Sequence, residues 1–95
     1  MGTADSSMKN ISQVENYARC LQEVSQYTEQ NFDKLKKQTD MIGQNWSDAQ
    51  FEEFQAQFNE TIIKQIKGTC QTLLRLSEYA KKQCEIHRMA QQHRL

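Results

Sequence analysis

The sequence contains no proline and only three glycines, at positions 2, 43 and 68. Proline and glycine are the residues that most often end helices and mark turns. Only Gly43 lies near the middle of the 95-residue chain. The scarcity of turn residues therefore predicts long helices with one central interruption.

The chain also lacks a net charge, because 12 basic residues balance 12 acidic residues. A neutral chain has no overall field that attracts nucleic acid or an anionic membrane. No apolar run approaches the roughly 18 residues of a membrane span, and residues 1–10 lack the apolar core of a secretory signal. We expect no nucleic-acid partner, no membrane insertion, and a cytoplasmic location or secretion without a cleaved signal peptide.

Apolar residues make up 37% of the chain, below the roughly 45–50% of an ordinary globular domain. A short chain this polar buries only a thin core, so a second copy or another partner is expected to complete it. The three cysteines, Cys20, Cys70 and Cys84, are odd in number and widely spaced. They do not form a disulfide framework, and reduced thiols in a reducing compartment are expected.

The sequence has no glycine-rich phosphate loop and no nucleophile elbow, and both histidines lie in its last nine residues. These absences argue against catalysis and against a cofactor. Cys84 and His87 stand three residues apart, so a helix would place two soft ligands on one face. A structural zinc site needs four ligands, and we expect no metal here, with Cys84 on a helix seam and His87 on the surface.

A regular apolar seam predicts the first helix, over residues 11–42. Its positions alternate in steps of three and four, as in a heptad repeat. They are Ile11, Val14, Ala18, Leu21, Ser25, Thr28, Phe32, Leu35, Thr39 and Ile42. Gly43 follows directly, where a residue with positive φ commonly closes a helix. Residues 1–10 before this helix are expected to be flexible.

The second helix is expected to begin at about residue 47 after a turn over 43–46. Ser47 and Gln50 have the spacing of a capping box, flanked by Trp46 and Phe51 as a hydrophobic staple. Its main seam has helical spacing and runs through Phe51, Phe54, Phe58, Ile62, Ile66, Thr69, Leu73, Leu76 and Ala80. The helix is predicted to reach about residue 90, with a flexible tail over 91–95.

A connection of about three residues forces the two helices into an antiparallel hairpin. Because a second stripe widens the apolar face of the second helix, something besides the first helix is expected to pack there. The predicted fold is therefore an all-α hairpin that dimerises into a four-helix bundle. The interface residues are predicted to be Ile62, Ile63, Ile66, Cys70 and Leu74. Residues beyond about 80 are expected to overhang the first helix.

Trp46 is the only tryptophan and falls in the predicted turn. A large amphipathic ring is costly to leave exposed. One interpretation is a staple that closes the hairpin. The other is that Trp46, with Ser47, Asp48 and Phe51, forms a turn motif and one wall of a groove that a partner helix completes.

A hairpin of this length with a tryptophan in its turn resembles the WXG superfamily, the ESAT-like small helical-hairpin proteins associated with type VII secretion. The resemblance covers roughly residues 11–90 and rests on architecture, length and Trp46. Asp48 stands where the family has glycine, and Gln83 stands where many members have an acidic residue four positions after a tyrosine, here Tyr79. The resemblance implies a bacterial homodimer or heterodimer that is secreted without a cleaved signal or accompanies a larger secreted effector.

Two functions follow as hypotheses. The first is a non-enzymatic, WXG-like interaction protein that pairs with itself or with a related helical hairpin as a secretion substrate or effector partner. The alternative is a cytosolic coiled-coil adaptor that binds a protein partner through the C-terminal part of the second helix. Partner recovery that depends on that part of the helix would distinguish the adaptor from the secreted protein.

Overall fold

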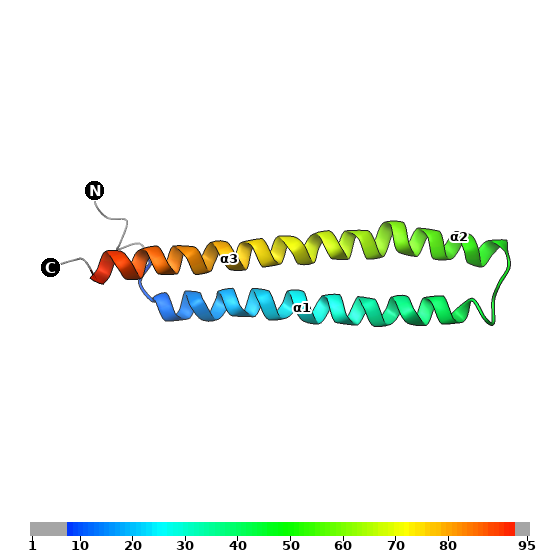
Figure 1. The fold of residues 1–95 in the computed structure, drawn as a ribbon, viewed down its shortest axis with the longest axis horizontal. Helices are drawn as coiled ribbons and strands as arrows, with labels where there is room; N and C mark the ends of the chain where they lie inside the picture. The colour runs from blue at the N-terminus through cyan, green and yellow to red at the C-terminus, as the bar shows by residue number, and fades with distance from the viewer. Residues whose placement is uncertain (1–7, 93–95) are drawn as a thin grey trace.

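The computed structural model describes residues 8–92, and all regular structure within them is helical. Helix α1 spans Ile11–Ile42. The chain returns as one long arm made of α2 (Ala49–Gln57), the π-helix η2 (Phe58–Ile63) and α3 (Lys64–Gln92). Figure 1 shows α1 antiparallel to this arm, in a hairpin with extents of 71 × 19 × 14 Å. The predicted all-α hairpin is confirmed.

Two helix ends differ from the predicted ends, each by about two residues: the start of α2 and the end of α3. α1 covers the predicted range, and the side chain of Asn10 caps it by accepting a hydrogen bond from the Gln13 amide at 3.0 Å. α3 continues through Gln92, so the predicted end at about residue 90 is too early. Of the segments predicted to be flexible, residues 1–7 and 93–95 lie outside the described residues.

Gly43 ends α1, but not through a left-handed conformation. Its φ is −58° and its amide donates to the Asp40 carbonyl at 3.2 Å. The prediction of positive φ is therefore wrong. Glycine is needed here for space, because a Cβ at this position would lie 2.9 Å from Cε2 of the Phe51 ring. The missing side chain lets Phe51 pack against the end of α1.

The contact between Gly43 and the Phe51 ring predicts opposite changes in stability when each of the two described glycines is replaced by alanine. Gly43→Ala should lower the free energy of unfolding by about 1–3 kcal/mol, since the buried Phe51 ring must shift. Gly68→Ala is the matched control, because its Cβ would meet nothing within 4 Å on an exposed helix face. That control should gain about 0.5–1 kcal/mol from helix propensity. Urea unfolding followed by circular dichroism measures both, and equal effects would contradict the packing role of Gly43.

α2 begins at Ala49, about two residues later than predicted, and its N-cap lies one residue later than the capping box suggested. The N-cap is Asp48, whose carboxylate accepts a hydrogen bond from the Phe51 amide at 3.0 Å. Ser47 is exposed in the turn and does not cap the helix. Asp48 rather than Ser47 caps the helix because an ionised carboxylate is a stronger hydrogen-bond acceptor than a hydroxyl at the positive end of a helix.

The contact between the two arms is a narrow seam of small side chains. On α1 it contains Ala18 and Ser25, and on α3 it contains Cys70, Ser77 and Cys84, all almost completely buried. The Ser25 hydroxyl donates to the Cys70 carbonyl at 2.8 Å, and the Ser77 hydroxyl donates to the Ala18 carbonyl at 2.6 Å. Small side chains let the backbones approach closely enough for these bonds across the helices.

This seam is not the one predicted for the second helix. The predicted seam ran through Ile62, Leu73 and Leu76, whereas Ile63, Cys70, Ser77 and Cys84 are the buried residues, each seven positions after the last. The π-helix accounts for part of the difference. Phe51 and Phe58 are also seven positions apart, but Ile63 follows Phe58 after five positions instead of seven. The extra residue of the π-helix keeps Phe51 and Phe58 on the same side of the arm as Ile63 and the buried residues after it. This is the side that faces α1.

The far end of the return arm is also more fully paired than predicted. The register places Cys84 against Ile11, with the Cys84 thiol 3.8 Å from the Ile11 carbonyl. Arg88 reaches Glu15 of α1 through hydrogen bonds. The expectation that residues beyond about 80 lack a partner in their own hairpin is therefore wrong, because α3 is covered by α1 at least as far as Arg88.

Candidate partner-binding site

The two sides of the hairpin differ sharply in polarity. On one side, which we term the ion-pair side, Arg88 bonds Glu15, and the Lys81 ammonium donates to the Gln22 side chain at 2.7 Å. The two buried seams face each other. The heptad positions one residue before and three residues after each seam position therefore lie on the side of the hairpin opposite the ion-pair side. These positions on α1 and the return arm carry no charged residue, and we term this surface the charge-free face.

The charge-free face has nine positions on each arm. On α1 they are Val14, Tyr17, Leu21, Val24, Thr28, Asn31, Leu35, Gln38 and Ile42. On the return arm they are Ile62, Ile66, Thr69, Leu73, Leu76, Ala80, Gln83, His87 and Ala90. A quarter of the whole chain is charged, so the absence of charge along two arms indicates a surface suited to burial rather than to solvent.

Several of the larger apolar side chains lie on this face rather than in the seam. Leu76 is 50% exposed, and Val24, Leu35 and Ile62 are also exposed. The most deeply buried side chains are the small ones, Ser25, Cys70, Ser77 and Cys84. Burial of small side chains contributes little hydrophobic stabilisation. The single hairpin therefore leaves large apolar side chains exposed that a partner could bury.

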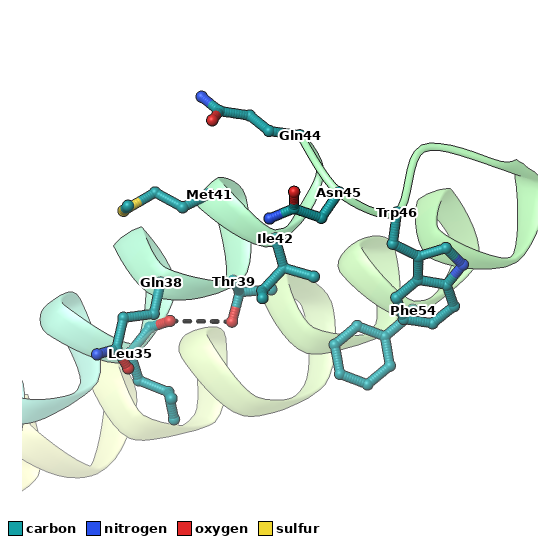
Figure 2. Close-up of a pocket in the computed structure, with 9 residues that line it drawn as sticks. All are labelled: Leu35, Gln38, Thr39, Met41, Ile42, Gln44, Asn45, Trp46 and Phe54. Atoms are coloured by element: carbon teal, nitrogen blue, oxygen red, sulfur yellow. Dashed lines mark hydrogen bonds between the residues drawn. The ribbon is translucent and has the colours of Figure 1, made fainter.

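At the tip of the hairpin the face deepens into a groove of about 590 Å³ between the end of α1 and the start of α2. Figure 2 shows Trp46 beside Phe54, with Leu35 and Ile42 on the α1 side. No charged residue lines the groove, whose other lining residues are Gln38, Thr39, Met41, Gln44 and Asn45. The site is therefore an apolar groove with polar uncharged edges.

The Trp46 ring contacts two phenylalanines. Its centroid lies 5.4 Å from that of Phe51 in an edge-on arrangement and 5.8 Å from that of Phe54. Trp46 remains 38% exposed, whereas Phe51 is 5% exposed. Trp46 thus acts both as a lid over buried Phe51 and as part of the groove, so each of the two interpretations of this residue describes part of its surroundings.

The other predicted turn-motif residues have separate places. Phe51 is buried beneath Trp46, and Asp48 caps α2. Ser47 is exposed and, like Asp48 and Phe51, does not line the groove. Phe54 and Ile42 line it instead. The second-helix pattern had placed Phe54 on the seam with α1, and only the fold of the turn brings it next to Trp46.

The five residues predicted to form the partner interface are divided by the structure. Ile62 and Ile66 lie on the charge-free face, exposed and half-buried respectively. Ile63 and Cys70 are 6% and 1% exposed in the seam with α1, so the prediction that they face a partner is wrong. Leu74 is half-buried and stands one heptad before Lys81, on the ion-pair side. Ile63 and Cys70 already contact their own hairpin.

The ion pair between Arg88 and Glu15 links the open end of the hairpin. Its hydrogen bond and positive charge lower the pKa of the Glu15 carboxyl and raise the pKa of Arg88. At the other end, the side-chain hydrogen bond from Gln55, at 2.9 Å, and the Lys36 ammonium lower the pKa of Asp40. While ionised, Glu15 accepts hydrogen bonds from Arg88 of α3, and Asp40 accepts one from Gln55 of α2. Both carboxylates therefore link α1 to the return arm.

These shifts predict a loss of stability in acid. A carboxyl with a lowered folded-state pKa stabilises the fold above its ordinary value, 4.5 for Glu15, and this contribution is lost as pH falls through the folded-state pKa. Wild type should therefore have a higher melting temperature than Glu15→Gln at pH 7, and the difference should vanish in acid. Circular dichroism melts across this range measure it, and a pH-independent difference would contradict the ion-pair mechanism.

Three further observations bound the chemistry of the described residues. All three cysteines are free, with Cys20 exposed and Cys70 and Cys84 buried. Residues 8–92 hold no cluster of three His, Cys, Asp or Glu side chains with the geometry of a metal site. Over the same span, neither arm of the hairpin combines the length and apolar character needed to cross a bilayer.

Comparisons of the chain with protein-family models, with curated proteins and with solved structures found no match. The geometry of the charge-free face and of the tip groove is therefore the basis for a functional conclusion.

Proposed function

We propose that the protein is a small, non-enzymatic interaction protein that pairs with a second helical hairpin through the charge-free face to form a four-helix bundle. The partner is a second copy of the chain or a related hairpin. The observation that carries this proposal is the placement of side chains, with small residues in the seam and Val24, Leu35, Ile62 and Leu76 exposed on one uncharged face.

The surface area of the hairpin supports this pairing. The chain exposes 7416 Å², whereas a compact monomer of 11.2 kDa exposes about 5700 Å². The difference of roughly 1700 Å² exceeds the about 800 Å² per partner that a standard interface buries. A second hairpin fits because it presents two parallel rows of apolar side chains along the same length.

Sedimentation velocity of the full chain tests the pairing directly. A dimer at micromolar concentrations, dissociating on dilution, is the expected result. A chain that stays monomeric up to the highest soluble concentration would overturn pairing with its own copy. Mixing with a candidate hairpin partner would then test the heterodimer by the same measurement.

A WXG-like role in secretion is the biological setting that we propose for this pairing. Trp46 in the turn of a full-length hairpin, next to an uncharged groove, supports it. In this setting the dimer is itself exported or accompanies a larger secreted effector. Its abundance in culture supernatant should then fall when a specialised secretion apparatus of the host is deleted, with a cytosolic marker as the control for lysis.

The alternative is a cytosolic adaptor that binds through the C-terminal part of α3. Tyr79, Ile86 and Met89 support it, because these large side chains are exposed near the open end of the hairpin. Since Cys84 and Arg88 contact α1, truncation would damage the hairpin. Substitution of Tyr79 and Ile86 by serine is the better test, and loss of a co-purified intracellular partner with retained dimerisation would favour the adaptor.

A further inference from the structure

Two sulfur atoms meet at the open end of the hairpin, one helical turn from a buried histidine. Cys84 is completely buried, and its Sγ lies 3.9 Å from Sδ of Met8, which precedes α1. His87 is one helical turn beyond Cys84 on α3 and is only 9% exposed. The contact is not evident from the sequence, because Met8 and Cys84 are 76 positions apart.

His87 has an unsatisfied polar atom. Its Nδ1 is buried and has no hydrogen-bond partner among residues 8–92. A buried polar atom without a partner is costly, and a bound water or ion is one of the few explanations for such an atom in a native fold. The expectation that His87 is a surface histidine is therefore wrong, and its position calls for a ligand.

We propose that Cys84, His87 and Met8 form a binding site for Cu(I). Thiolate and thioether sulfur are the soft ligands that select this ion, and imidazole nitrogen also suits copper. Zinc prefers four ligands, and residues 8–92 hold no group of three His, Cys, Asp or Glu side chains arranged to bind a metal ion. Two sulfur donors in contact, with an imidazole one helical turn away on the same helix, fit an ion that accepts low coordination.

The separation of the two sulfur atoms fits a shared ion. Two sulfurs bound at about 2.3 Å from one metal and 3.9 Å from each other subtend an angle of about 115° at the metal. This angle is close to that of a three-coordinate centre, so the two sulfur atoms need little movement to share an ion. On binding, a bond forms between copper and Sγ, the Cys84 thiol loses its proton to solvent, and the oxidation state of copper is unchanged.

Anaerobic titration of the full chain with Cu(I), in competition with a chromophoric Cu(I) chelator, tests the site. Cys20→Ser serves as the background, because Cys20 is an exposed thiol that would bind copper independently. This background protein should take one equivalent of Cu(I) and melt at a higher temperature with copper bound. Cys84→Ser should lose the high-affinity equivalent, and Met8→Leu and His87→Gln should each weaken it by about tenfold or more.

The matched control is Cys70→Ser, which changes another buried thiol on the same seam of α3 and should leave binding unchanged. Retained binding in Cys84→Ser, or full affinity in both Met8→Leu and His87→Gln, would overturn the proposal. If Cys84→Ser fails to fold, Ag(I) added to the background protein gives a second readout by NMR. The methyl signal of Met8 should shift while those of exposed Met41 and Met89 do not, and an unchanged Met8 signal would overturn the site.

Discussion

The Leu76→Glu variant is expected to be a monomer at concentrations where the wild-type chain is a dimer. Leu76 is 50% exposed in the single hairpin, so the substitution leaves the intramolecular seam intact. In the proposed bundle the same position is buried among uncharged residues. An unpaired buried charge costs about 3–5 kcal/mol, which corresponds to a rise in the dissociation constant of at least about a hundredfold.

Gln71→Glu is the matched control for this variant. Gln71 is exposed five residues earlier on α3, on the ion-pair side of the hairpin, and the substitution adds the same charge. Sedimentation equilibrium should show an unchanged dimer for Gln71→Glu and a monomer for Leu76→Glu, with equal helical circular dichroism. Equal dissociation constants for the two variants would place the interface elsewhere.

The Phe51→Ala variant is expected to lose about 3–5 kcal/mol of unfolding free energy, the usual cost of removing a buried aromatic ring. Phe51 is 5% exposed, lies under the Trp46 ring and fills the space left by Gly43. Among residues 8–92 no other large side chain is buried at the tip, so the start of α2 would lose its anchor to α1. A loss of this size is a large part of the 5–15 kcal/mol of a typical domain.

Phe54→Ala separates this anchor from the neighbouring groove. Phe54 also contacts Trp46, but it is 50% exposed and lines the groove. Its substitution should therefore cost much less, about 1 kcal/mol, as is usual when a ring is only partly buried. Urea unfolding of both variants measures the contrast, and similar losses would show that Phe51 is not the anchor of the tip.

The pattern of apolar residues predicts α1 well, because its stripe is narrow. Ile11, Ala18, Ser25 and Thr39 belong to the predicted seam and are buried. The stripe on the return arm is wide, and periodicity alone does not tell which edge of a wide stripe faces a neighbour. The larger side chains Leu73 and Leu76 were expected inside, whereas Cys70 and Ser77 are there.

The tip groove was predictable in its central residue and not in its outline. Trp46 stood out as a lone aromatic residue in a short turn. Its neighbours depend on the path of the turn, which the Asp48 cap and the missing side chain of Gly43 set together. These local contacts place Phe51 under Trp46 and Phe54 beside it.

The sequence by itself determined an all-α antiparallel hairpin, because it has no proline, one central glycine and a heptad repeat. Only the tertiary structure decided which residues the hairpin keeps for itself and which remain exposed. The physical reason is the close approach of the two backbones, which admits Ser25, Cys70 and Ser77 and excludes larger side chains. The same approach brings Met8 to Cys84 across the open end, a contact between residues that no local pattern relates.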